Sequence, residues 1–190
     1  MKLVFATHNL HKFNEVKAMF PKTTQLFSLP DIGCTSEIPE TADTIEGNAI
    51  LKANYVRDRY DLDCFADDTG LEVAALNNAP GVHSARYAGP DKDAKANVAK
   101  LLLALEGKEN REARFKTALS LALHNENRMF LGICEGSITQ FPRGEGGFGY
   151  DPVFQPLGFE ATFAQMSLAQ KSEIGHRGKA MQRLLEYLLA

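Results

Sequence analysis

The chain lacks a run of apolar residues long enough to cross a membrane, and no cationic leader precedes the apolar pattern that starts at residue 2. It has only three cysteines, Cys34, Cys64 and Cys134, which lie far apart and form no C-x-x-C pair. Such spacing is typical of buried free thiols in a reducing compartment. We therefore expect a cytoplasmic protein with no membrane partner.

The chain also lacks an excess of positive charge, since 21 lysine and arginine residues face 24 aspartate and glutamate residues. The formal net charge of −3 and the absence of a basic stripe argue against a nucleic-acid partner. A small anionic ligand would need a local basic pocket. The sequence has no internal repeat and no low-complexity linker, so we expect a single domain over 1–190 made of two integral lobes.

Apolar periodicity predicts alternating strands and helices, and hence an α/β fold. Strands are predicted at 2–6, 25–29, 64–66, 115–123 and 129–141, with a turn at 124–127. Helices are predicted at 10–20, 44–60 and 91–105 and near the C-terminus, where Met181, Leu184, Leu185 and Leu188 share one face. Thr44 is the expected N-cap of its helix, and Gly132 and Gly136 are expected to be bulges or points of close backbone approach.

Two adjacent carboxylates follow the short apolar run of the third strand, in the segment F-A-D-D-T-G at 65–70. Aspartate and glutamate oxygens are the ligands that Mg²⁺ prefers, and Mg²⁺ commonly completes its shell with water and substrate phosphates. Asp67 and Asp68 therefore indicate either a magnesium site or an ordinary polar turn ending in glycine. Glu40 and Glu46 flank the start of the next helix upstream and are further candidate ligands, Glu40 being the better one if its loop faces the aspartates.

The segment T-H-N-L-H-K at 7–12 lies where the first strand gives way to the first helix. Amide groups at a helix start favour an anion, and Thr7, Asn9 and Lys12 can add polar and charged contacts to it. The alternative is that Thr7 and Asn9 are ordinary helix caps and that Lys12 lies on a solvated surface. The two histidines have no third ligand at suitable spacing, so we expect them to be exposed polar residues.

A glycine-rich loop at 144–149 contains a formal G-x-G-x-x-G, but the chain after it looks extended instead of helical. This context excludes a dinucleotide-binding turn, and G-x-x-x-x-G-K-[ST] is absent, so a P-loop is excluded as well. What remains is a loop whose Phe148, Tyr150 and Asp151 are suited to a flat heterocycle. A tight loop with both aromatic rings in the core is the alternative.

A second cationic group precedes the last helix, in the segment K-S-E-I-G-H-R at 171–177. Arginine offers a planar fork for a carbonyl or phosphate, and lysine offers a point charge. A solvated helix lead-in would have the same composition. The segment therefore indicates an anion or base contact only in combination with the other motifs.

Five motifs occur together and in order along the chain. They are T-x-N-x-x-K at 7–12, A-D-D-T-G-L at 66–71, A-P-G-V-H-S-A-R-Y-A-G at 79–89, G-G-F-G-Y-D-P-V-F at 146–154 and H-R-G-K-A at 176–180. In this combination the chain resembles the inosine triphosphate pyrophosphatase family. The resemblance implies a homodimer that hydrolyses ITP, dITP and XTP to the monophosphate and pyrophosphate with Mg²⁺. It also implies a two-lobed α/β fold in which an elongated mixed β-sheet is flanked by helices and the substrate cleft lies between the lobes.

The resemblance assigns a role to individual residues. Asp68 matches the proton acceptor and a metal ligand, and Glu40 matches the other metal-associated acid. The triphosphate contacts would be Thr7, Asn9, Lys12, Lys52 and Lys171. The other substrate contacts would be Thr69, Phe148 stacked on the purine, Gly149, Tyr150 and Asp151 lining its pocket, and His176 and Arg177 at the 6-oxo edge of the base.

A carboxylate bound to Mg²⁺ is a poor base, because the cation stabilises its ionised form and acidifies bound water. We therefore expect Asp68 to orient metal and water and to accept a proton only transiently. Which of Glu40, Glu46 and Asp67 completes the metal shell stays open.

Two positions depart from the family pattern: Gly175 stands where a serine is usual, and His8 where a glycine is common. The first removes one polar contact near the base. Two other functions are weighed against the leading one. The related Maf-like pyrophosphatases act on modified or pyrimidine nucleotides with a similar architecture, and a nucleotide sensor would keep the pocket without turnover. The intact acids and lysines speak against a sensor.

Overall fold

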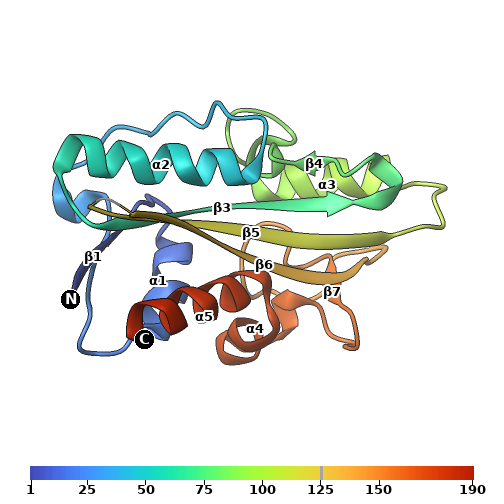
Figure 1. Cartoon of the computed structure of the whole chain (residues 1–190). Helices are drawn as coiled ribbons and strands as arrows, with labels where there is room; N and C mark the ends of the chain where they lie inside the picture. The colour runs from blue at the N-terminus through green and yellow to red at the C-terminus, as the bar shows by residue number, and fades with distance from the viewer. Residues whose placement is uncertain (125) are drawn as a thin grey trace. The chain divides into compact units, whose positions relative to one another are not determined.

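Strands and α-helices alternate along the chain up to residue 73, as the apolar periodicity predicts (Figure 1). The computed structural model describes residues 1–124 and 126–190. Its strands are β1 (Lys2–Phe5), β2 (Gln25–Phe27), β3 (Cys64–Val73), β4 (Pro80–Gly81), β5 (Glu112–Leu123), β6 (Glu126–Ile138) and β7 (Phe154–Pro156). Its α-helices are α1 (Leu10–Met19), α2 (Ile45–Tyr60), α3 (Ala94–Ala104), α4 (Leu168–Ile174) and α5 (His176–Leu189).

The strands form one mixed sheet in the order β2-β1-β3-β5-β6-β7, and β4 pairs with β3 outside this path. Strand β1 is parallel to both β2 and β3, with Val4 opposite Cys64. Strand β4 is antiparallel to β3, and β7 is antiparallel to β6. A mixed sheet flanked by helices confirms the predicted α/β class.

The chain divides into two compact units. The first comprises Met1–Asp68, Thr117–Gly132 and Gly178–Ala190, and the second comprises Thr69–Lys116 and Ile133–Arg177. Strands β3, β5 and β6 and helix α5 each contribute residues to both units. The first boundary is the peptide bond between Asp68 and Thr69.

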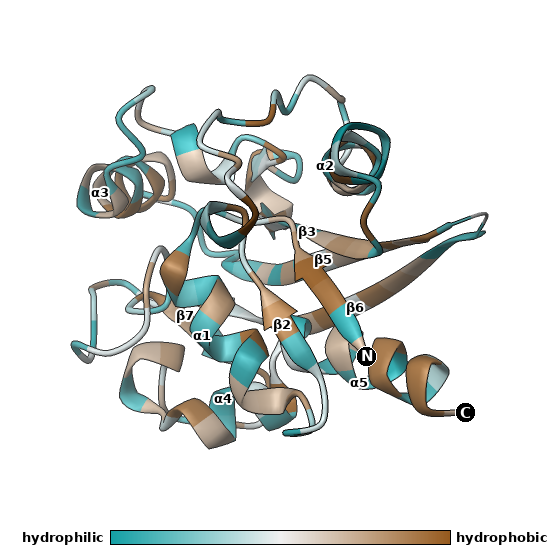
Figure 2. Cartoon of the chain, turned by 90° about the vertical axis from the view of Figure 1, so that its left-hand side faces the viewer, coloured by the Kyte–Doolittle hydropathy of each residue, from teal (hydrophilic) through white to brown (hydrophobic). Residues whose placement is uncertain are grey.

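In the first unit, successive strand residues face opposite sides of the sheet, as a pleated strand requires. Leu3 and Phe5 of β1 pack in one apolar cluster with residues of α1 and α5, whereas Val4 packs in another with Ala53 and Val56 of α2. Helix α2 therefore covers one face of these strands, and α1 and α5 cover the other (Figure 1). Figure 2 shows both hydrophobic and hydrophilic residues on these helices, as expected for helices that bury one face.

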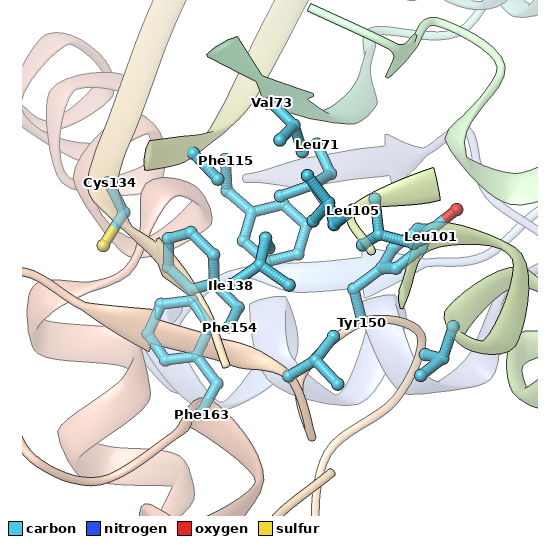
Figure 3. Close-up of a cluster of buried hydrophobic side chains, with 13 residues drawn as sticks. Leu71, Val73, Leu101, Leu105, Phe115, Cys134, Ile138, Tyr150, Phe154 and Phe163 are labelled. Atoms are coloured by element: carbon cyan, nitrogen blue, oxygen red, sulfur yellow. The ribbon is translucent and has the colours of Figure 1, made fainter. Parts of the chain in front are cut away.

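The second unit has a core of its own, drawn in Figure 3. Leu71 of β3, Phe115 of β5 and Phe154 of β7 pack in it, and the rings of Phe115 and Phe154 meet edge to face with centroids 4.7 Å apart. Tyr150, from the glycine-rich loop, lies in the same cluster. The loop is thus anchored by a ring of its own in this core.

Most predicted elements agree with the structure to within a few residues, but the end of β3 does not. The predicted strand at 64–66 continues to Val73, so the expected turn at 67–70 is wrong. Leu71 and Val73 are fully buried, and β4 pairs with β3 at Leu71. Because of this packing, the chain stays extended through the polar residues.

Other local predictions are confirmed. The side chain of Thr44 caps α2 by accepting from the Gly47 amide, and a Cβ on Gly136 would come within 2.3 Å of the Gln155 carbonyl oxygen. The predicted turn at 124–127 includes Asn125, which lies outside the described residues, and β6 already begins at Glu126. Within the described residues, no helix is long and apolar enough to span a membrane.

Candidate active site

The two adjacent aspartates face opposite sides of the sheet. Because β3 stays extended through both, their side chains alternate. Asp67 forms an ion pair with Lys12 of α1, with Oδ1 3.1 Å from Nζ. Asp68 instead turns to α2, where its Oδ1 lies 3.5 Å from Nζ of Lys52. The strand conformation therefore separates two carboxylates that a turn would have allowed to converge.

Glu40 shares a partner with Asp68. Its Oε1 lies 2.6 Å from Nζ of Lys52, so one ammonium group contacts the carboxylate of the acidic loop and that of β3. We call Lys12, Glu40, Lys52, Asp67 and Asp68 the acid–lysine cluster. All five belong to the first unit. The loop of Glu40 thus faces Asp68, the condition on which its candidacy as a metal ligand depended.

Burial sets the protonation chemistry of Asp68. Desolvation raises the pKa of its carboxyl above the usual value, the nearby Lys52 and Lys12 oppose this rise, and Glu40 and Asp67 add to it. For Lys52, burial is the largest single effect and lowers the pKa. The charges of Asp68, Glu40 and Asp67 outweigh it, and the net pKa is raised. Lys52 therefore stays cationic, while Asp68 is a stronger proton acceptor than a solvated aspartate.

The segment between β1 and α1 is organised by its own side chains. Asn9 is the N-cap of α1, and its Oδ1 accepts hydrogen bonds from the amides of His11 and Lys12. Thr7 is buried, and its Oγ1 accepts from the Asn9 amide at 3.1 Å. Asn9 is thus a helix cap, as one of the two predicted alternatives required. Lys12, however, is paired with Asp67 and does not lie on the solvated surface that this alternative also required. The phosphate contacts of Thr7, Asn9 and Lys12 stay a prediction.

The carboxylates of the acid–lysine cluster suit Mg²⁺ only if water and substrate phosphates supply the other ligands. In the described part of the chain, no three histidine, cysteine, aspartate or glutamate side chains group together as a metal cage. Mg²⁺ is usually held by one or two carboxylates, with water and substrate phosphates completing the octahedron. Glu40 and Asp68, joined through Lys52, match that requirement. Asp67 faces Lys12 instead, and Glu46 lies in the first turn of α2.

The second unit brings together an aromatic ring, a carboxylate and two cations. Nζ of Lys171 lies 2.6 Å from Oδ2 of Asp151 and 4.6 Å from the centroid of the Phe148 ring. Cζ of Arg177 lies 5.7 Å from the same ring. The Phe148 amide also donates to Oδ2 of Asp151 at 2.8 Å. We call Phe148, Asp151, Lys171 and Arg177 the ring–cation cluster.

The structure places Lys171 differently from its predicted companions. Lys12 and Lys52 lie among the carboxylates of the first unit, whereas Lys171 is buried against Asp151 and Phe148 in the second. This position associates Lys171 with the predicted base contacts. Its assignment to the triphosphate stays a prediction.

The remaining predicted base contacts also lie in the second unit. His176 opens α5 with its ring stacked on that of Phe115, at a centroid distance of 4.6 Å. Arg177 donates from Nη2 to Oγ1 of Thr69 at 3.2 Å. Tyr150 donates its hydroxyl to the Ser84 carbonyl at 2.7 Å, so it anchors the loop in the core. Gly149 has a φ of +62°, a conformation that suits glycine.

Three residues outside the two clusters, which support the site, were not predicted from the sequence. Asn48 donates to Oδ2 of Asp68. Its position one helical turn before Lys52, and so on the same face of α2, could have indicated that it lies near the site. Gly147 has a φ of +69°, and a Cβ there would lie 2.1 Å from Oδ2 of Asp151. Ser84 accepts from the Leu71 amide and donates to the Gly81 carbonyl. Ser84 belongs to the motif at 79–89, but the sequence did not assign it a role.

The mixed sheet and its flanking helices define an α/β protein, whose first unit holds a buried aspartate paired with a lysine. A family model described as the Ham1 family matches residues 3–187. The chain belongs to the Ham1 family.

Several similar proteins carry one name, dITP/XTP pyrophosphatase. That of Christiangramia forsetii is 56% identical over 188 residues and covers 99% of both chains. That of Flavobacterium johnsoniae is 56% identical over 190 residues and covers 100% of this chain and 99% of the relative. The similarity therefore extends over both units.

Solved structures share the fold. The Staphylococcus aureus Ham1 protein aligns with a TM-score of 0.90 at 38% identity, covering 99% of this chain and 98% of its own. A Mycobacterium abscessus structure named nucleoside-triphosphatase / dITP/XTP pyrophosphatase aligns with a TM-score of 0.79 at 40% identity, covering 97% and 99%. Both alignments extend over nearly the whole chain.

Proposed function

We propose that this chain hydrolyses the noncanonical purine nucleotides ITP, dITP and XTP to the nucleoside monophosphate and pyrophosphate. The observation that carries the proposal is the buried Asp68, held by Lys52 beside Glu40, in a chain 56% identical over nearly its whole length to proteins named dITP/XTP pyrophosphatase. Removal of such nucleotides would cleanse the nucleotide pool.

The two clusters divide the work of recognition. The acid–lysine cluster supplies groups of both signs, as a magnesium–triphosphate complex requires: carboxylates for the cation and ammonium groups for the phosphates. The ring–cation cluster supplies an aromatic face for a purine and cationic donors for an oxo group. A 6-amino group is itself a donor, so adenine would place donor against donor and bind less well.

Mg²⁺ is the cofactor we propose, held by Glu40 and Asp68. When bound, it lowers the pKa of coordinated water and offsets phosphate charge. Lys12 and Lys52 would then exchange their carboxylate partners for phosphate oxygens. Support for this comes from the donor set alone, which is two acids that share one partner.

Asp68 is the proposed catalytic residue. It would orient the attacking water and accept one of its protons while the water oxygen bonds to phosphorus and the α–β phosphoanhydride bond breaks. Pyrophosphate would leave with the bridging oxygen. Desolvation raises the pKa of Asp68, whereas a bound cation would lower it, so Asp68 would hold this proton only transiently.

A homodimer in the cytoplasm completes the proposal. The dimer follows from the family resemblance, whereas the cytoplasm follows from the sequence, and the three buried free cysteines agree with a reducing compartment. Light scattering on the purified protein tests the assembly directly: a mass of twice 20.9 kDa supports the dimer, and a mass of 20.9 kDa contradicts it.

The reaction is tested by identifying its products by ³¹P NMR during turnover of ITP with Mg²⁺. Inosine monophosphate and pyrophosphate support the proposal, and chelation with EDTA should stop their formation. Turnover of modified pyrimidine nucleotides in preference to ITP would instead assign the chain the chemistry of Maf-like enzymes. Binding of ITP without any product would indicate a nucleotide sensor.

A further inference from the structure

Asn48 is a buried amide with a hydrogen bond at each end. Its side chain donates from Nδ2 to Oδ2 of Asp68 at 3.3 Å and accepts at Oδ1 from the backbone amide of Ala42 at 2.9 Å. The residue is 2% exposed. A backbone N–H can only donate, so the contact with Ala42 fixes which end of the amide is oxygen and points the NH₂ group at Asp68.

The first consequence concerns the plane of the Asp68 carboxylate. Asn48 and Lys52 lie one turn apart on α2, and each contacts a different oxygen, Oδ2 and Oδ1 respectively. The terminal torsion of aspartate is broad, so a single contact would leave the carboxylate free to rotate. Two anchors on one rigid helix fix it, and each oxygen keeps a second lone pair for other partners.

The second consequence concerns the loop that carries Glu40. Ala42 lies two residues beyond Glu40, so the Asn48 amide holds the acidic loop against the same helix. Gly47 allows this approach, because a Cβ there would come within 2.6 Å of the Ala42 Cβ. One side chain therefore connects Asp68 with the segment of Glu40, in addition to the ammonium group of Lys52.

We propose that Asn48 is a positioning residue that sets the orientation of Asp68 and its distance from Glu40, and so tunes metal affinity and turnover without contacting substrate. This inference rests on the proposed function for its kinetic part. An amide suits the role because it is neutral and has a donor at one end and an acceptor at the other. A carboxylate at this position would keep the Ala42 bond and repel Asp68.

Two substitutions separate the two bonds. Asn48→Ala removes both, whereas Asn48→Asp keeps an acceptor for the Ala42 amide and replaces the donor to Asp68 with an oxygen that repels it. Asn97 of α3 provides a matched control, since it is 4% exposed, donates to the Ala85 carbonyl and accepts from the Ala88 amide. Asn97→Ala therefore removes an equivalent pair of bonds in the other unit.

The measurements are kcat and KM for ITP, and Mn²⁺ affinity by electron paramagnetic resonance without nucleotide. Loss of an outer partner of a metal ligand typically lowers metal affinity or activity by about 10- to 100-fold, and we expect both Asn48 variants to lose kcat and Mn²⁺ affinity in that range. KM for ITP should change by less than about threefold, because no substrate contact is removed. Asn97→Ala should lower thermal stability and leave kcat and Mn²⁺ affinity near those of the wild type.

The order of the variants in kcat and Mn²⁺ affinity distinguishes a positioning role of Asn48 from a purely structural one. If the amide only held the loop, Asn48→Asp would behave as the wild type while Asn48→Ala lost activity, and the proposal would be wrong. Equal behaviour of Asn48→Ala and Asn97→Ala would also overturn it. Should Asn48→Ala not fold, Asn48→Asp carries the test. Failure of the proposed function is distinguishable, because a wild type inactive on ITP still permits the Mn²⁺ comparison.

Discussion

Asp68 combines a low exposure with partners on two residues of one helix. A buried carboxylate loses the hydration that stabilises its charge, and the contacts with Lys52 and Asn48 replace part of that stabilisation. The outcome is a carboxyl group whose pKa is raised yet whose position is held. Such a combination is expected of a group that moves a proton during a reaction.

Replacement of this carboxylate should separate turnover from binding. Asp68→Asn keeps the shape and removes the proton acceptor, so kcat for ITP should fall by at least about 100-fold. Binding of ITP, measured by calorimetry, should stay within about threefold of the wild type, because the lysines remain. An equal loss of binding and turnover would mean that Asp68 mainly holds substrate.

Cys64 offers a pH-dependent test of the first unit's core. Burial raises the pKa of its thiol from 9.0 to about 12, so the folded protein keeps this thiol protonated where the unfolded chain ionises. The resulting stability is fully present below pH 9 and is lost as pH rises towards 12. Relative to Cys64→Ala, the free energy of unfolding of the wild type should fall above pH 9 by up to about 1.4 kcal/mol per pH unit.

Urea denaturation of both proteins between pH 7.5 and about 10.5 measures this difference. The other cysteines and the tyrosines are common to both proteins, so their titration cancels in the comparison. Parallel stability curves above pH 9 would show that Cys64 ionises equally in the folded and unfolded states.

At the scale of elements, α2 depends on a glycine that a helix would normally disfavour. Gly47→Ala would usually stabilise a helix, by up to about 1 kcal/mol in its interior. Here the added methyl would lie 2.6 Å from the Ala42 Cβ and 2.9 Å from Oγ1 of Thr44. We expect a net loss of about 1 to 3 kcal/mol in the free energy of unfolding, as for other overpacked sites.

A double substitution identifies the cause of that loss. Ala42→Gly removes the methyl that the new Cβ would meet, so Ala42→Gly combined with Gly47→Ala should recover part of the stability. The recovery appears as a favourable coupling energy in a double-mutant cycle measured by urea denaturation. Additive losses would show that the methyl groups of residues 42 and 47 do not collide.

In the glycine-rich loop, Gly147 leaves the space that Asp151 of the ring–cation cluster occupies. Gly147 has a φ of +69°, and its Cβ would fall 2.1 Å from Oδ2 of Asp151, the oxygen that binds Lys171. Gly147→Ala should therefore displace Asp151 and raise KM for ITP by about tenfold or more, since a strained residue costs about 1 to 3 kcal/mol. The Mg²⁺ dependence of the rate should stay unchanged.

Gly158 supplies the control for this prediction. It also has a positive φ, +85°, but no atom lies within 4 Å of its would-be Cβ. Gly158→Ala should lower stability through backbone strain alone and leave KM as it was. Equal KM values for the two variants would show that the space around residue 147 does not shape the loop.

Helices α1, α2, α3 and α5 and the buried strands β1, β5 and β6 could be predicted from the sequence because their apolar periodicity is local. The seven-residue helix α4 was not predicted. The end of β3 could not be predicted, because D-D-T-G has the composition of a turn and only the distant packing of Leu71 and Val73 keeps it extended. That single difference changed the site: an extended strand sends Asp67 to Lys12 and Asp68 to Lys52. Residue types alone carry no such directional information.

At the scale of the whole molecule, each apolar cluster belongs to a single unit, while three strands run through both. The predicted phosphate and metal residues of the N-terminal third fall in the first unit, and the predicted base contacts fall in the second. The sequence did not predict this division. Nor did it predict the roles of Asn48 and Ser84, because their partners are distant in sequence.

The most direct test of the proposed function compares kcat/KM for ITP, XTP, dITP, ATP and GTP with Mg²⁺ while the phosphate product is identified. We predict pyrophosphate from ITP, dITP and XTP. We also predict a kcat/KM for ATP at least about 100-fold lower, because a base site built for an oxo group leaves a 6-amino group unpaired. Release of orthophosphate, or equal efficiency with ATP, would contradict the proposed function.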